Sequence, residues 1–93
     1  MANAIITFKI MPESPDVDLE AIKEHAQKIA KEAGAMGKML IEEKPIAFGL
    51  KAVLIKAMYH VEEGKDFDGI ANKMQEIENV QSAEITGMDL PLG

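Results

Sequence analysis

Apolar and polar positions alternate along the chain with two different periods, and together they predict six elements. Runs rich in β-branched residues predict strands at Ala4–Met11 and Val80–Asp89. A weaker strand is predicted at Met36–Glu43. The segment Phe48–Val61 carries apolar side chains on both phases of its alternation, which predicts a central strand with one side covered by helices.

Two further stretches follow the 3.6-residue period of an amphipathic helix. The first has one apolar face, made by Leu19, Ile22, Ala26, Ile29, Ala30 and Ala33. Asp16 or Asp18 is expected to cap its start, because a short carboxylate can accept the free backbone N–H groups there. Gly34 is expected just beyond its end, in a left-handed conformation that glycine adopts without penalty.

The second helix is predicted at about Asp66–Glu78. Its apolar stripe consists of Phe67, Ile70, Ala71, Met74 and Ile77. Asp66 is the expected cap, and Gly69 weakens the first turn because glycine is a poor helix former. A polar turn at Glu62–Lys65 precedes this helix, and Leu90–Gly93 form a loose tail.

The resulting order, strand–helix–strand–strand–helix–strand, predicts an α+β ferredoxin-like βαββαβ sandwich. In this fold both helices cover one face of a four-stranded antiparallel sheet, and the other face stays open. Ninety-three residues suffice for one domain, which we expect to span residues 1–93. The fold alone does not decide the function, since many unrelated activities share it.

Charge and composition narrow the possible functions. Sixteen acidic residues against ten basic ones give a formal net charge of −6, and every basic residue is a lysine. A nucleic acid would be repelled overall, so we expect no direct nucleic-acid binding. Cysteine is absent, which excludes disulfides, thiol catalysis and thiolate metal sites. With neither a signal peptide nor a long apolar segment, the chain is expected to be cytoplasmic and without membrane contact.

The usual signatures of enzyme chemistry are missing. His25 and His60 stand alone without further metal ligands at a suitable spacing, so we expect no metal site. The adjacent pairs Glu42–Glu43 and Glu62–Glu63 point apart in a strand or turn, so they are interpreted as solvated charges. No phosphate-cradling glycine loop and no serine triad are present, and no cofactor is expected.

The few aromatic residues and the methionines favour structural roles. An RNA-binding sheet would need stacking aromatics on its first and third strands. Phe8 could be one, but the third strand offers only Phe48 at its start and Tyr59 at its end. Neither of these two has a basic context, so a core or edge role is expected for them. The methionines are expected mostly to fill gaps in the core; they include Met36, Met39, Met58, Met74 and Met88.

One apolar segment, Pro45-Ile-Ala-Phe-Gly49, allows two interpretations. Phe48 could be a hydrophobic plug under a loop, with Gly49 providing a bend. Alternatively, Phe48 could be an exposed aromatic anchor for a protein partner. The residues by themselves favour the plug.

Three segments make the chain resemble the archaeal elongation factor 1-beta family across nearly its whole length. They are Met11-Pro-Glu-Ser-Pro-Asp-Val-Asp-Leu-Glu20, Glu43-Lys-Pro-Ile-Ala-Phe-Gly-Leu-Lys51 and Val80-Gln-Ser82. Members of this family are guanine-nucleotide exchange factors for the GTPase elongation factor 1-alpha. The resemblance implies the ferredoxin-like fold and a factor that is not an enzyme but promotes GDP release and GTP reloading during polypeptide elongation.

The resemblance also implies a partner-binding site. Phe48 occupies the position of the aromatic that touches the GTPase, in the turn with Pro45 and Gly49. The end of the last strand corresponds to the segment that enters the partner near its magnesium ion, here Met88, Asp89 and Leu90. Leu90 replaces the penultimate lysine of eukaryotic members, so the lysine mechanism does not transfer. We expect Phe48 and the strand end to wedge the partner's phosphate and magnesium loops apart.

Two other classes of function use the same topology. A regulatory module that binds a small molecule, such as an amino acid, would pair its sheets between subunits and gain stability from its ligand. A small acyl-phosphate-type hydrolase would require an anion-binding loop, ordinarily with arginine, and the chain has no arginine. Neither class accounts for the segments that carry the resemblance.

Overall fold

A computed structural model describes residues 3–61 and 66–90. The elements follow the chain as β1 (Asn3–Pro12), α1 (Leu19–Glu32), β2 (Met36–Pro45), the short 3-10 helix η1 (Ala47–Gly49), β3 (Lys51–His60), α2 (Phe67–Gln75) and β4 (Val80–Asp89). The predicted turn at Glu62–Lys65 and the tail beyond Leu90 lie outside the described residues.

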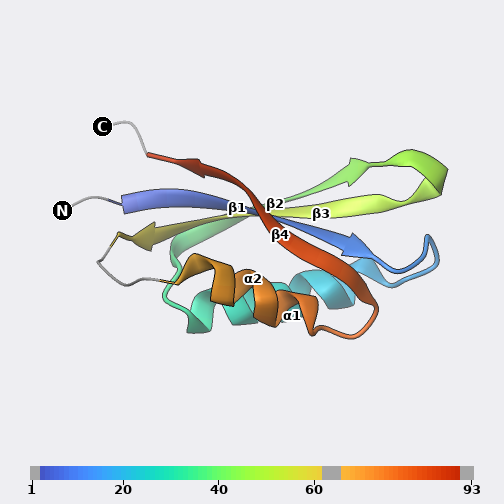
Figure 1. The fold of residues 1–93 in the computed structure, drawn as a ribbon, viewed down its shortest axis with the longest axis horizontal. Coiled ribbons are helices and arrows are strands. Elements are labelled where there is room, and N and C mark those ends of the chain that lie inside the picture. Colours follow the sequence, from blue (N-terminus) through green and yellow to red (C-terminus); the bar gives the residue numbers. More distant parts are fainter. Residues whose placement is uncertain (1–2, 62–65, 91–93) are drawn as a thin grey trace.

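The four strands form one antiparallel sheet in the order β2-β3-β1-β4. Both helices lie on the same side of this sheet, and the opposite face is open (Figure 1). The predicted ferredoxin-like α+β fold is therefore confirmed. β3 is a central strand, as its apolar residues on both phases predict. Its helix-side phase is fully buried, whereas Leu54 and Met58 on the other phase are half-buried.

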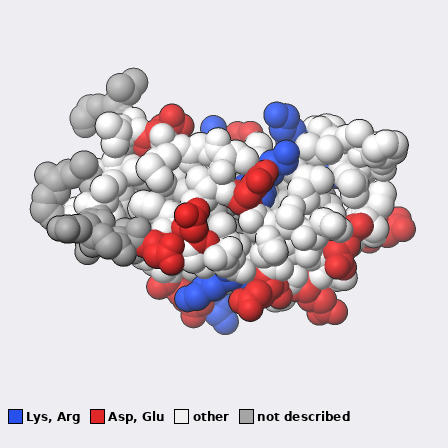
Figure 2. Space-filling model, in the orientation of Figure 1, with Lys and Arg blue, Asp and Glu red and all other residues white. Residues whose placement is uncertain are grey.

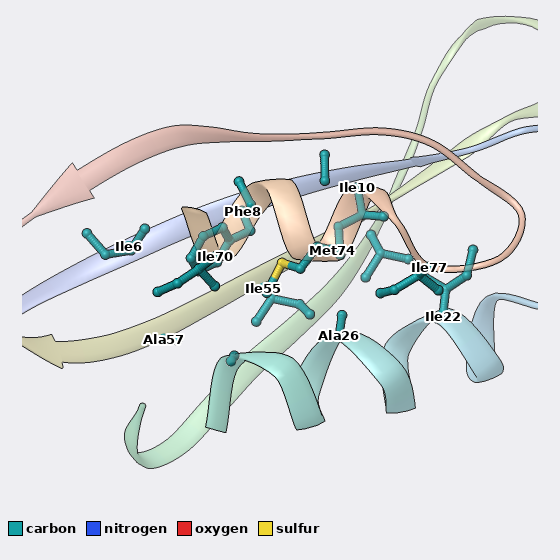
Figure 3. Close-up of a cluster of buried hydrophobic side chains, with 14 of the residues drawn as sticks. Ile6, Phe8, Ile10, Ile22, Ala26, Ile55, Ala57, Ile70, Met74 and Ile77 are labelled. Atoms are coloured by element: carbon teal, nitrogen blue, oxygen red, sulfur yellow. The ribbon is translucent and has the colours of Figure 1, made fainter. Parts of the chain in front are cut away.

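The core lies between the sheet and the helices. Alternate residues of β1 and β3 point toward the helices and are fully buried: Ile6, Phe8, Ile10, Val53, Ile55 and Ala57. From the other side, α1 contributes Ile22 and Ala26, while α2 contributes Ile70 and Met74 (Figure 3). The inward positions on both helices agree with the predicted apolar stripes.

Both helices begin at the predicted aspartates. Asp18 accepts a hydrogen bond from the backbone N–H of Glu20 at 3.1 Å, and Asp66 accepts one from that of Gly69 at 2.9 Å. A Cβ atom at Gly69 would lie 2.6 Å from the Asp66 carboxylate. Gly69 therefore makes room for the cap, a benefit that helix propensity alone does not reveal. Gly34 follows α1 with a φ of 109°, as predicted.

Two predictions about the apolar residues are wrong. β3 begins at Lys51 rather than at Phe48, because Phe48 and Gly49 belong to η1. Of the methionines named above, only Met74 is fully buried, and Met88 is exposed. Met39 of β2 is half-buried and packs against the core, whereas Met36 of β2 and Met58 of β3 are half-buried outside it.

Tyr59 belongs to the core, as expected, and so does Phe8. Their rings lie 6.4 Å apart, edge to face, on the helix side of the sheet. The Tyr59 hydroxyl donates a hydrogen bond to the backbone carbonyl of Ala30 in α1 at 3.0 Å. Burial raises the pKa of Tyr59 to about 12, because the phenolate would be removed from water. The open face therefore lacks the two aromatics that a base-stacking surface would need.

Candidate functional site: two exposed ends of one sheet

The turn between β2 and β3 presents Phe48 to solvent. The side chain is 93% exposed, the largest exposed fraction among the big apolar residues that the structure describes. Pro45 closes β2 opposite Lys51 and is also exposed, as is Gly49. The interpretation of Phe48 as a buried plug is therefore wrong, since nothing in the described part of the chain covers it.

The backbone of this turn explains why Phe48 points outward. Phe48 has φ 65° and ψ 27°, and Gly49 follows with φ 77°, so two successive residues are left-handed. The N–H of Ile46 donates to the carbonyl of Leu50 at 2.7 Å and closes the loop. A left-handed conformation costs a non-glycine residue roughly 1–2 kcal/mol. The fold thus retains a strained phenylalanine that contributes no packing of its own.

A group of ionic contacts joins this hairpin to α1. The Glu43 carboxylate of β2 accepts a hydrogen bond from Lys23 of α1 at 2.5 Å and lies 4.0 Å from the Nζ of Lys51. The hydrogen bond from Lys23 lowers the pKa of Glu43, and the same bond raises the pKa of Lys23. Glu43 is therefore paired, whereas its neighbour Glu42 points to the other face, as expected for adjacent strand residues.

The second candidate region is the end of β4. Met88 is 59% exposed and Leu90 is 71% exposed. A register shift between Thr7 and Phe8 places Met88 opposite Ile6, on the helix side of the sheet. Asp89 pairs with Ile5 and is also exposed, on the open side. The strand end therefore offers an apolar side chain to one face and a carboxylate to the other.

Next to Asp89 the open face carries a groove that the sequence did not indicate. Its volume is about 270 Å³, and it is lined by Ile5, Lys38, Leu40, Lys56, Met58 and Asp89. Leu40 is 62% exposed, although it lies within a strand. The sequence carries only a weak signal for this groove, because Leu40 and Ile41 are adjacent and only the strand register shows which of the two side chains faces the open side.

The two candidate regions lie at opposite ends of the sheet. The hairpin turn is at the right of Figure 1, and β4 ends at the left. The hairpin turn immediately precedes Lys51, the first residue of β3. At the end of β4, Asp89 pairs with Ile5 of β1, and Ile5 pairs with Met58 of β3. Seven residues of strand separate these positions, which corresponds to about 23 Å. Phe48 and the strand end would therefore reach a partner as two separate contacts, and the expectation that they wedge its phosphate and magnesium loops apart stays a prediction.

Neither histidine has the surroundings of a metal site. His25 is exposed on α1, and His60 shares a hydrogen bond of 3.1 Å with the side chain of Asn3. Within residues 3–61 and 66–90, no three histidine or acidic side chains gather closely enough to hold a metal ion. Over the same residues, no helix has the length and apolar character needed to cross a membrane.

Comparison with known proteins shows to which family the chain belongs. Residues 5–90 match the model of the EF-1 guanine nucleotide exchange domain. The chain belongs to this family. The chain is 40% identical to elongation factor 1-beta of Pyrococcus horikoshii over 83 residues, which cover 89% of each protein. Elongation factor 1-beta of Methanothermobacter thermautotrophicus is 40% identical over 86 residues, which cover 92% of this chain and 93% of the relative.

A third relative extends the similarity to almost the whole chain. Elongation factor 1-beta of Methanosphaerula palustris is 39% identical over 90 residues, which cover 97% of this chain and 99% of the relative. The exchange domain match contains both the hairpin turn with Phe48 and the strand end with Met88. The resemblance seen in the sequence is therefore confirmed.

Proposed function

We propose that this chain is a guanine-nucleotide exchange factor that binds elongation factor 1-alpha and promotes GDP release and GTP reloading during polypeptide elongation. The match to the exchange domain over residues 5–90 carries this proposal. Relatives named elongation factor 1-beta, of nearly the same length as this chain, support it. The place of action is the cytoplasm, where elongation occurs.

Such a factor acts by differential binding and needs no bond chemistry. It must bind the nucleotide-free GTPase more tightly than the GDP-bound form. By thermodynamic linkage, GDP then weakens the binding of the factor by the same ratio. A coupling of about 4 kcal/mol corresponds to roughly a thousandfold change in affinity.

The contact residues are proposed at both ends of the sheet. At the hairpin end, Phe48 is the anchor, flanked by Pro45 and Gly49. Its exposure and its strained backbone support this role, because the fold gains nothing from either feature. A large rigid aromatic is also among the residues that most often dominate interface energies.

At the other end, Met88, Asp89 and Leu90 form the second contact. Leu90 offers apolar surface where eukaryotic members of the family carry lysine, so this end acts by steric insertion and apolar contact rather than by an ammonium group. Because about 23 Å of sheet separates the two ends, the partner must present two separate surfaces. The sheet then holds the two contacts at a set distance, and exchange follows when the partner accommodates both at once.

The experiment is nucleotide release from elongation factor 1-alpha loaded with a fluorescent GDP analogue, in excess GTP. Wild-type chain at increasing concentration is expected to accelerate the loss of fluorescence to a saturating rate. No acceleration over the spontaneous rate would contradict the proposed function. If the chain failed there but gained thermal stability with an amino acid, the regulatory-module alternative would be favoured.

The dependence on magnesium tests how the strand end acts. If the end of β4 loosens the bound metal, excess Mg²⁺ suppresses the stimulated rate. If it displaces only the phosphate-binding loop, the stimulated rate stays the same. Measuring both wild type and Leu90→Lys shows whether an ammonium group at this position adds a metal-dependent component.

A further inference from the structure

A second surface, separate from the hairpin turn, gathers positive charge on this acidic protein. A groove of about 510 Å³ lies between α1 and the beginning of β2. Its lining consists of Gln27, Lys28, Lys31, Gly37, Lys38 and Met39. Three of the ten lysines of the chain meet there, and among residues 3–61 and 66–90 no carboxylate lines the groove. We call it the lysine groove.

The β2 side of the lysine groove is a bulge. The pairing of β2 with β3 jumps from Met36 opposite Met58 to Leu40 opposite Lys56. The three residues between them, 37–39, face a single residue of β3 and have no register partner there. A bulge locally interrupts the regular ladder, and bulges often occur next to sites where a ligand approaches the backbone.

Gly37 makes the bulge approachable. Its φ is +68°, and a Cβ atom added to it would meet nothing within 4 Å. A glycine in such a position allows another group to come close to the backbone. Because β2 is an edge strand of the sheet, no further strand covers this side.

The α1 side contributes Lys28 and Lys31, which stand three residues apart and therefore share a helix face. Neither they nor Lys38 form an ion pair with any residue in the described part of the chain, whereas Lys23 and Lys51 are both within reach of Glu43. Lysines near a helix end complement the macrodipole, and lysines on an edge strand prevent aggregation. Those roles explain each charge singly, but not their gathering around a concave bulge.

The chemistry of the lining selects the ligand. Ammonium groups are compact point charges that suit densely charged phosphates, whereas planar carboxylates are better matched by arginine, which the chain lacks. No aromatic ring lines the groove, so a nucleobase would have nothing to stack on. The net charge of −6 opposes a long polyanion, and carboxylates line much of the visible lower surface in Figure 2.

We propose that the lysine groove binds a compact oligophosphate, either inorganic or the phosphate chain of a free nucleotide. The three ammonium groups neutralise the phosphates, and the N–H groups of the bulge donate to their oxygens. This site uses neither the hairpin turn nor the apolar residues of the strand end, although Lys38 also lines the groove beside Asp89.

The test is a titration of the 15N-labelled wild-type chain with inorganic triphosphate and, separately, with GTP. We expect the amide signals of Gly37, Lys38 and Met39 to shift most, and the two ligands to bind with affinities within threefold of each other. Shifts spread evenly over all lysine-bearing surfaces, or none at the bulge, would overturn the proposal. Tighter binding of an RNA oligonucleotide or an acidic peptide at the same amides would overturn the assignment to a compact phosphate.

Matched variants separate the groove from the overall charge. K31Q/K38Q removes two groove lysines, and K44Q/K73Q removes two exposed lysines that do not line it. Both variants have the same net charge. We expect triphosphate affinity to fall at least tenfold in the first and less than threefold in the second. Equal losses in the two would assign the binding to general electrostatic attraction and contradict a defined site.

Discussion

Replacing Phe48 provides the sharpest test of how the factor recognises its partner. A phenylalanine side chain offers about 200 Å² of surface, and here 93% of the residue is exposed. Complete burial against the partner would be worth about 5 kcal/mol at roughly 25 cal/mol per Å². Ordering and desolvation at an interface consume part of this, so about 2 kcal/mol is expected, which is roughly a thirtyfold loss of affinity in Phe48→Ala.

Substitutions at Phe48 should leave the fold intact. Since Phe48 makes no core contact, Phe48→Ala is expected to change the free energy of unfolding by less than about 0.5 kcal/mol. Phe48→Gly relieves a left-handed strain of roughly 1–2 kcal/mol but adds freedom to the unfolded chain. The glycine variant should therefore be as stable as wild type, or up to about 1 kcal/mol more stable, while it binds the partner no better than the alanine variant.

Release of fluorescent GDP from elongation factor 1-alpha, measured over a range of factor concentrations, separates two roles for the aromatic. If Phe48 contacts the loaded and empty partner equally, only the half-saturating concentration rises. If the contact forms mainly with the empty partner, the maximal rate falls as well. Urea unfolding of each variant serves as the control. A folded Phe48→Ala with wild-type kinetics would refute the anchor.

Three other predictions follow from the remaining features. In Phe48→Ala/Leu90→Ala, the losses of exchange efficiency should add in free energy within about 0.5 kcal/mol, because the residues lie at opposite ends of the sheet; strong coupling would contradict two separate contacts. The pKa of Tyr59 is raised to about 12, so as the pH rises the tyrosine ionises first in the unfolded chain. Its contribution to the free energy of unfolding, about 2–3 kcal/mol, is present below pH 10 and should be lost between pH 10 and 12. Absorbance at 295 nm follows this single tyrosine, and Tyr59→Phe should show a shallower alkaline loss of the unfolding midpoint in urea. Glu43→Gln should lower that midpoint at pH 7 but not at pH 3, because a carboxylate with a lowered pKa stabilises the fold only while it is ionised; an equal effect at both values would show that Lys23 is not the cause.

The order of elements could be predicted because local signals agree with the final fold. Asp18 and Asp66 can cap wherever a helix begins beside them, and both do. The alternation of Ala83 and Ile85 with exposed Glu84 and Thr86 in β4 likewise describes a strand with one covered face. Such features depend on neighbours within a few residues, so the chain alone is sufficient to read them.

The exposure of Phe48 could not be predicted from its neighbours in the sequence. An apolar segment before a glycine looks the same whether the rest of the chain covers it or leaves it free. The deciding facts are that the hairpin extends past both helices and that Phe48 itself adopts the left-handed conformation. The interpretation as a plug followed the general tendency of aromatics to be buried, and here tertiary structure overrides that tendency.

The relative placement of the two contact regions required the sheet register. The end of β4 is distant from the hairpin turn because β1 lies between β4 and β3 and runs antiparallel to both. Phe48 and Leu90 belong to one proposed function, yet nothing in their local sequence indicates that a sheet length separates them. The lysine groove is similar, since Lys28 and Lys38 meet only when β2 folds back beside α1.

The antiparallel pairing of β1 with both β3 and β4 has a consequence for how members of this family can diverge. Adding one regular residue to these strands would reverse which side chains beyond it face the helices, unless a bulge absorbs that residue, as at the register shift between Thr7 and Phe8. The separation of the two tips can therefore change by two residues, about 6.6 Å, within the regular ladder, or by one residue where a bulge forms. Side chains at either tip can change without altering this separation, whereas a change in the separation requires one of these two backbone rearrangements.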